Sequence, residues 1–246
     1  MTEQEWLACT DPQKILEFSR GKASDRKLRL FAVACCRRIW DFLPTDACQR
    51  AVEIAERYAD DQAANRELSS AWSAVAASAE EEGIKVFDPY EQENIEWGDI
   101  PGGSAVMASI ELLGERDVDA AHVASHAALE VAWDAGRLRK GKEAAQLAFD
   151  NDYAVERIAQ TMALRDIFGN PFRPVTIDPA WLTWNDGTIP KLAQAIYDER
   201  AFDRMPILAD ALEEAGCTNS GILDHCRQPA EHVRGCWVVD LILGKE

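Results

Sequence analysis

Helix start and stop signals recur along almost the whole chain, and they constrain its fold more than any other feature. Thr2 with Glu5 matches a capping box, and Asp11 followed by Pro12 matches an N-cap with proline at the first helical position. Ser24 and Thr45 stand at two further helix starts. Runs of alternating apolar and polar residues, which strands require, do not occur. The pattern predicts an all-α protein, either a multi-helix bundle or an orthogonal helical array.

The expected helices are bounded by these signals and by prolines and glycines. They cover about residues 12–20, 24–42, 46–61, 65–82, 104–113, 118–139, 143–168, 189–200, 203–216, 220–227 and 231–243.

Two segments interrupt the helical pattern. Residues 83–103, "GIKVFDPYEQENIEWGDIPGG", hold five acids against one lysine and are expected to form one long irregular surface insertion, with a binding loop as the alternative. Residues 168–187, "FGNPFRPVTIDPAWLTWNDG", contain three prolines and predict an aromatic, proline-rich loop without a helix. This loop divides a helical N-terminal region, 1–168, from a C-terminal unit, 169–246. The two either form separate domains or pack as one.

Composition narrows the class of protein. The chain has 246 residues and a net charge of −17, which discourages binding to nucleic acids or anionic membranes. No run approaches the ~20 apolar residues that span a bilayer. The start, "MTEQEWLACTDPQK", lacks the apolar segment of a secretory signal, so a cytoplasmic protein is expected. The seven cysteines are an odd number, and most are expected to be buried thiols rather than disulfides.

The stretch "SDRKLRLFAVACCRRIW" is locally basic. Residues 20–38 hold seven basic side chains and one acid, a local charge of +6. An apolar stripe that includes Leu28, Phe31 and Cys35 runs between them at helical spacing. We therefore expect a core helix whose arginines pair with acids on neighbouring helices, with phosphate binding as the alternative. Cys36 lies beside two arginines, which would favour a reactive thiolate if the residue were exposed.

The C-terminal stretch "GCTNSGILDHCRQPAEHVRGCWVVD" concentrates three cysteines and two histidines. His232 and Cys236 are four residues apart and would share one face of the expected helix 231–243. Cys217 and Cys226 could approach from the preceding turn and helix to complete a Cys3His zinc site, with His225 as a substitute ligand. The alternative is that these cysteines pack in the core.

A second pair of histidines, His122 and His126, also shares a helix face, with Asp119 and Glu130 one turn to either side. Imidazole and carboxylate groups in such an array can ligate zinc or iron. The glutamate of the His-Glu-x-x-His pattern is missing, so the alternative is a polar face on an alanine-rich helix.

The proline-rich loop supplies a candidate binding groove. Phe172, Arg173, Trp181 and Trp184 combine aromatic rings with a cation, as a ligand or peptide groove would. The alternative is that the rings fasten the loop to the neighbouring helices. Glycine-rich phosphate loops, dinucleotide fingerprints and nucleophile elbows do not occur in the sequence.

Both ends of the chain resemble a large set of uncharacterised bacterial paralogues. The opening, "EWLACTDPQKILEFSRGKASDRKLRLFAVACCRRIW", and the closing stretches "LRDIFGNPFRPV" and "HVRGCWVVDLILGKE" carry the resemblance, which covers about residues 1–60 and 162–246. It implies that the terminal regions form one recurrent architecture. It implies no substrate, cofactor or catalytic residue.

These observations predict a cytoplasmic helical binding or scaffold module without catalysis, whose partner is a protein rather than a nucleic acid or a membrane. No cofactor is expected under this interpretation. The alternative is a metal-binding protein or metal-dependent enzyme that uses the C-terminal cysteines and histidines, with zinc as the metal.

Overall fold

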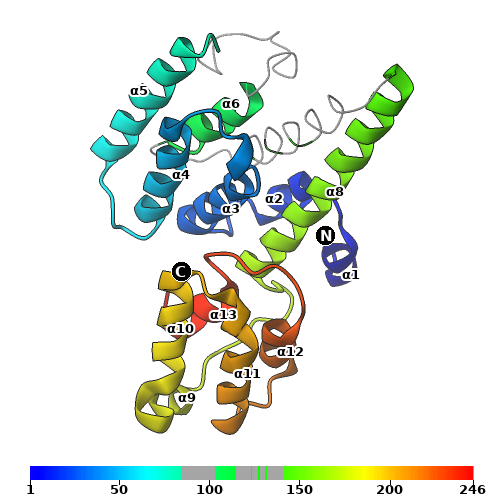
Figure 1. Cartoon of the computed structure of the whole chain (residues 1–246). Helices are drawn as coiled ribbons and strands as arrows, with labels where there is room; N and C mark the ends of the chain where they lie inside the picture. Colours follow the sequence, from blue (N-terminus) through cyan, green and yellow to red (C-terminus); the bar gives the residue numbers. More distant parts are fainter. Residues whose placement is uncertain (85–102, 115–122, 124–126, 128–130, 132–140, 246) are drawn as a thin grey trace. The chain divides into compact units, whose positions relative to one another are not determined.

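The computed structural model describes residues 1–84, 103–114, 123, 127, 131 and 141–245. Within these ranges the chain forms α-helices and short 3-10 helices and no β-strand, which confirms the expected all-α class (Figure 1). It divides into two compact units. We call residues 8–161 the N-terminal unit, and residues 1–7 together with 162–246 the C-terminal unit. The long helix α8, Lys142–Phe168, contributes to both.

The N-terminal unit follows the predicted helices closely. Asp11, Ser24 and Thr45 each accept a hydrogen bond from a backbone N–H of the helix that they cap. Each N-cap side chain satisfies a donor that the first turn would otherwise leave unpaired. The helices are α2 Pro12–Ser19, α3 Asp25–Arg38, the 3-10 turn η1 Trp40–Phe42, α4 Asp46–Ala59, α5 Asn65–Glu81 and α6 Gly103–Glu111.

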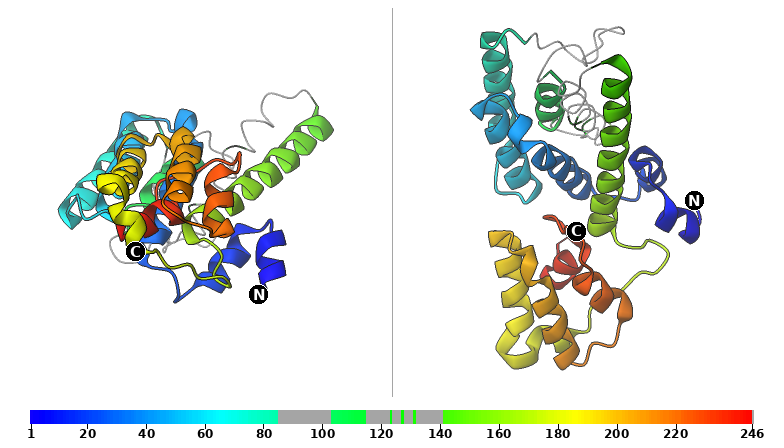
Figure 2. Two further views of the ribbon diagram at one scale, coloured as in Figure 1. Left: turned by 90° about the horizontal axis from the view of Figure 1, so that it is seen from below. Right: turned by 45° about the vertical axis from the view of Figure 1, so that its right-hand side comes forward.

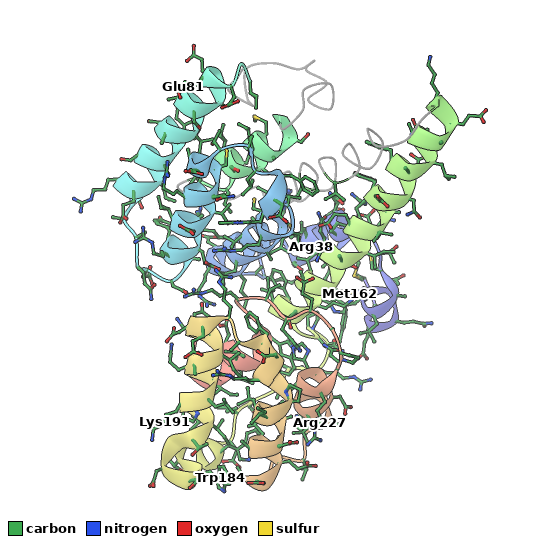
Figure 3. All side chains as sticks on the ribbon, in the orientation of Figure 1. Arg38, Glu81, Met162, Trp184, Lys191 and Arg227 are labelled. Carbon is green, nitrogen blue, oxygen red and sulfur yellow. The ribbon has the colours of Figure 1, made fainter. Side chains whose placement is uncertain are left out.

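Two arginines of α3 pair with acids on other helices, as the sequence predicts. Arg37 Nη2 lies 2.9 Å from Glu56 Oε2 on α4. Arg38, labelled in Figure 3, donates from Nε and Nη2 to the two carboxylate oxygens of Glu156 on α8, at 2.9 and 3.0 Å. Arg29 is buried and donates to the carbonyl oxygens of Leu112 and Gly114, each at 2.7 Å. These pairs use the basic edges of α3 for structure.

The adjacent cysteines of α3 are both fully buried. Burial raises the pKa of the Cys35 thiol well above its usual value. Burial likewise raises the pKa of Cys36, and its neighbours Cys48 and Glu111 add to that effect more than Arg37 opposes it. A reactive thiolate at Cys36 is therefore contradicted, because the side chain lies inside the unit rather than on its basic edge.

The C-terminal unit is built on α10 and α11, which contact each other, with α12 and α13 packed against them (Figures 1 and 2). Its apolar core includes Ile189, Tyr197, Leu208 and Val239. The elements are α1 Glu3–Ala8, α9 Pro179–Thr183, η3 Trp184–Gly187, α10 Thr188–Glu199, η4 Phe202–Arg204, α11 Met205–Glu214, α12 Ser220–Arg227 and α13 Trp237–Leu243.

Two expectations about helices in this unit are wrong. Residues 168–187 contain the short helix α9, because Asp178 caps it and Pro179 occupies its first turn, the same signal that starts α2. The last helix begins at Trp237 rather than near residue 231, and residues 228–236 form an irregular segment that contains no helix. His232 and Cys236 therefore do not share a helix.

The boundary between the units also differs from the expected division after residue 168. It falls inside α8, after Thr161, and residues 1–7 belong with the C-terminal unit. Arg165 donates from Nη2 to the carbonyl oxygen of Trp6 at 2.7 Å, and Asn170 donates to Glu3 Oε1 at 2.7 Å. These long-range hydrogen bonds attach α1 to the end of α8.

The expected helix 118–139 and the insertion 83–103 fall almost entirely outside the described residues. Among the helices that are described, none combines the length and the apolar character needed to cross a membrane.

Candidate metal centre

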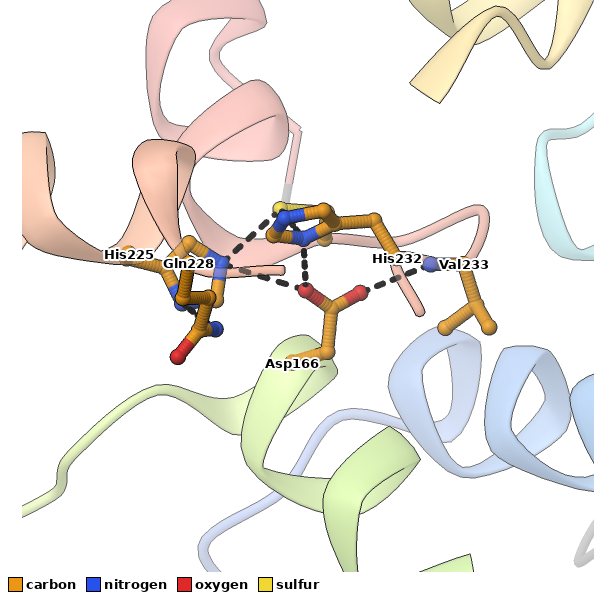
Figure 4. A network of polar contacts seen from close by, with 6 residues as sticks. Asp166, His225, Gln228, His232 and Val233 are labelled. Atoms are coloured by element: carbon orange, nitrogen blue, oxygen red, sulfur yellow. Dashed lines mark hydrogen bonds and ion pairs between the residues drawn. The ribbon is translucent and has the colours of Figure 1, made fainter. Parts of the chain in front are cut away.

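Four side chains that can ligate a metal converge inside the C-terminal unit. Asp166 comes from the last turns of α8, His225 from α12, His232 from the irregular segment, and Cys236 from the residue before α13 (Figure 4). One donor atom from each lies within 4.8 Å of the others. The group joins positions as far apart in the sequence as residues 166 and 236.

The contacts within the group are short. Asp166 Oδ1 lies 2.6 Å from His232 Nδ1 and 3.1 Å from His225 Nε2. Cys236 Sγ lies 3.2 Å from His225 Nε2 and 3.9 Å from His232 Nδ1. The Asp166 and His232 side chains are 3% and 4% exposed, and His225 is 10% exposed, so the group is almost closed to solvent.

Asp166 is held through both of its carboxylate oxygens. Oδ2 accepts a hydrogen bond of 2.8 Å from the backbone N–H of Val233, while Oδ1 faces the two imidazoles. Burial on its own would raise the pKa of this carboxyl, but the hydrogen bonds and charges of His225 and His232 outweigh burial and lower it. The backbone bond fixes which oxygen points into the group, so Asp166 is oriented to act as a ligand through one oxygen.

His225 is held on three sides. Its ring lies edge-on to the His232 ring, with centroids 4.9 Å apart, and contacts the Trp237 ring at 5.1 Å. The side-chain amide of Gln228 lies 3.1 Å from Nδ1. Because Nδ1 is engaged outside the group, Nε2 is the nitrogen that faces Asp166 and Cys236.

His232 presents the opposite ring nitrogen. Its Nδ1 faces Asp166, whereas its Nε2 is buried and has no hydrogen-bond partner among the described residues. The ring therefore makes its polar contacts within the group through Nδ1.

Cys236 provides the sulfur, and its thiol is fully buried. Burial raises the pKa of this thiol well above its usual value, and the negative charge of Asp166 raises it further. Without a cation nearby, the sulfur keeps its proton. A metal ion would replace that proton, because the thiolate is the form that binds metals.

The end of α8 approaches α13 closely beside this group. Gly169 has φ +67°, and a Cβ placed on it would lie 3.1 Å from Cγ of Trp237. Only glycine combines this backbone conformation with that contact at low cost. The contact places the turn after Asp166 against the residue that follows Cys236.

The arrangement does not match a nucleophilic Cys-His-Asp triad. In a triad, one imidazole nitrogen faces the nucleophile and the other faces the carboxylate. Here a single nitrogen, His225 Nε2, faces both Cys236 Sγ and Asp166 Oδ1. One donor atom from each of the four side chains lies within 4.8 Å of the others, an arrangement that could hold a metal ion.

The distances suit zinc. Zinc binds nitrogen and oxygen at ~2.0–2.2 Å and sulfur at ~2.3 Å, so tetrahedral donors lie roughly 3.3–3.6 Å apart. Four of the six separations in the group run from 2.6 to 3.9 Å and bracket this range, and the other two are at most 4.8 Å. Asp166 Oδ1 and His232 Nδ1, which are 2.6 Å apart, would have to separate by roughly 0.8 Å to bind one zinc ion together.

The structure places the expected ligands in three different ways. His232 and Cys236 meet, and His225, expected as a substitute, joins them. Cys217 and Cys226 instead belong to the apolar core and are not in the group. Burial raises the pKa of Cys226 to about 12, which suits an uncharged core thiol. His122 and His126 lie outside the described residues.

The four groove residues of the proline-rich loop play separate roles. Trp181 and Trp184 are half-buried and pack against the C-terminal core. Arg173 forms an ion pair with Glu3, and Phe172 is 38% exposed. Because both tryptophans pack against this core, they favour the alternative in which the rings fasten the loop to the helices.

Sequence reasoning missed Asp166. It lies 59 residues before His225, in a helix whose sequence carries no metal-ligand spacing. The signal in the sequence that could have indicated Asp166 as a candidate ligand is that it is the single acid in "LRDIFGN", directly before a helix end.

Comparisons with known proteins add no family or function: no family model, curated protein or solved structure matches this chain.

Proposed function

We propose that the C-terminal unit binds one zinc ion through Asp166 Oδ1, His225 Nε2, His232 Nδ1 and Cys236 Sγ. The observation that carries this proposal is the convergence of the four donor atoms within 4.8 Å of one another in a buried position. One thiolate, two imidazoles and one carboxylate form a donor set that suits zinc and not magnesium or calcium, which prefer oxygen ligands.

Charge balance supports a divalent ion. The thiolate of Cys236 and the carboxylate of Asp166 together carry two negative charges, which a Zn²⁺ ion would neutralise. A buried centre with no net charge avoids the large cost of an uncompensated buried ion.

The role that we propose for the ion is structural. Four protein donors complete a tetrahedral site, whereas a catalytic zinc keeps a position for water or substrate. The ion would join the end of α8 to α12, to the irregular segment and to α13. The zinc-bound unit would then be a stable part of a binding or scaffold module, the kind of protein that the sequence predicts.

The test is zinc binding by untagged protein purified without chelator. We expect about one zinc per chain by elemental analysis, and a thiolate-to-cobalt charge-transfer band when Co²⁺ replaces it. Cys236→Ala should lose both signals. Cys226→Ala is the matched control, because it removes a buried thiol from the same unit but outside the group. Protein without zinc affinity, or equal zinc affinity in both variants, would contradict the proposal.

A further inference from the structure

We infer that Gln228 is a positioning residue for the zinc centre, one that selects which nitrogen of His225 faces the metal. This inference rests on the proposed zinc site. The observation that supports it is the 3.1 Å contact between the Gln228 side-chain amide and His225 Nδ1. This contact lies on the side of the ring opposite Asp166 and Cys236 (Figure 4).

His225 depends on such a contact more than the other ligands do. Asp166 is oriented by a backbone N–H, and His232 is enclosed in the interior. His225 is the most exposed of the three, and the two aromatic rings beside it, His232 and Trp237, set the plane of the imidazole but not its protonation. A hydrogen bond to Nδ1 decides which nitrogen is free to bind a metal.

A glutamine amide can form a hydrogen bond with the ring whether or not Nδ1 carries a proton. Its NH2 group donates to an unprotonated Nδ1, and its carbonyl oxygen accepts from a protonated Nδ1–H after the amide turns over. When zinc binds Nε2, the ring proton must reside on Nδ1, and the carbonyl of Gln228 is the acceptor within reach. Metal-bound histidines commonly donate their second N–H to such an acceptor, which raises the basicity of the ligand.

The location of Gln228 makes this role separable from folding. It is the C-cap residue of α12, its side chain is exposed, and its backbone N–H bonds to the carbonyl oxygen of Asp224. Substitution of the side chain leaves that backbone bond in place. A change in zinc affinity can therefore be measured in a folded protein.

The experiment compares zinc affinity in three variants by competition with a chromophoric chelator. Gln228→Leu should weaken zinc binding about tenfold, the lower end of the range for loss of an outer partner. Gln228→Glu should strengthen binding, because a carboxylate holds the Nδ1 proton more firmly than an amide does. Gln194→Leu, an exposed glutamine of α10 that donates to Asp198, should match the wild type.

Long-range ¹H–¹⁵N spectra of the zinc-bound protein supply a readout that a merely structural role would not change. In the wild type, His225 should carry its proton on Nδ1, with slow exchange that becomes fast in Gln228→Leu. Wild-type zinc affinity in Gln228→Leu, together with unchanged exchange, would overturn this inference and leave the zinc site standing. Failure of the wild type to bind zinc would remove both.

Discussion

The two units bury ionisable side chains in different ways. In the N-terminal unit, Glu156 is matched by the guanidinium of Arg38, and Glu56 by that of Arg37. In the C-terminal unit, Asp166 meets two imidazoles and a thiol. A carboxylate paired with arginine has its charge balanced by the protein alone. The carboxylate of Asp166 is balanced either by protonated imidazoles or by a bound cation.

The cysteines show the same contrast. Cys35 and Cys36 are as buried as Cys236, but the charged groups that shift their pKa values are carboxylates and arginines, whereas Cys236 Sγ lies 3.2 Å from His225 Nε2. The presence of buried cysteines therefore does not distinguish a metal centre from a core. The convergence of different donor types on one position does.

The largest effect on the proposed zinc site should come from removing the carboxylate of Asp166. Asp166→Asn keeps the size of the side chain and an acceptor for the N–H of Val233, but it loses the anionic oxygen that would face zinc. We expect tight zinc binding to be lost, as measured by chelator competition. Asp198→Ala, which removes an exposed acid from the same unit, should bind zinc as the wild type does. Undiminished binding in Asp166→Asn would show that the centre does not need the carboxylate.

The next largest effect should come from the N-terminal unit and should not involve zinc. Arg38→Met leaves the Glu156 carboxylate, 5% exposed, without its guanidinium partner, and breaking a buried pair in this way costs about 3 kcal/mol or more. Urea unfolding should show that loss, while zinc affinity stays unchanged.

The double variant Arg38→Met with Glu156→Leu is the control for this experiment, because it removes both charges. It should recover much of the lost stability, since apolar replacements for a buried pair are often tolerated. If the single variant is as stable as the wild type, the pair does not stabilise the unit.

The smallest expected effect is a difference in the rate at which the individual cysteines are alkylated. Alkylation of the native protein, followed by mass spectrometry, should modify Cys9 first, because it is the partly exposed cysteine. Cys36 should stay unmodified whether or not zinc is present, because burial raises its pKa. Cys236 should react after treatment with a chelator and be protected when zinc is restored. Identical rates at Cys236 in both states would argue against its role as a ligand.

The sequence predicts most of the fold because residues at or next to each helix end determine where the helix begins and ends. Ser220 to Arg227 is a helix in both prediction and structure, and Gly216 adopts the positive φ expected of a helix stop. The helix at Pro179 could have been found in the same way, because Asp178 and Pro179 repeat the signal at Asp11 and Pro12. Aromatic and proline content concealed it.

The candidate site is harder to predict because its geometry is not local. The spacing of His232 and Cys236 suggested a shared helix face, but the two residues are in fact brought together by an irregular segment that is bonded to Asp166 at Val233. Helical spacing thus predicted that the two side chains lie close together, but the shared helix on which that prediction rested does not form. Asp166 could not be found from spacing, since only the folded chain brings α8 to α12 and α13.

The attachment of residues 1–7 to the end of α8 has a consequence for synthesis on the ribosome. Glu3 and Trp6 leave the ribosome before the N-terminal unit, whereas their partners Asn170 and Arg165 follow only after the whole N-terminal unit has been made. At typical elongation rates that delay is on the order of ten seconds or more. The N-terminal unit can therefore fold first, and residues 1–7 can form these hydrogen bonds only after Arg165 and Asn170 have left the ribosome.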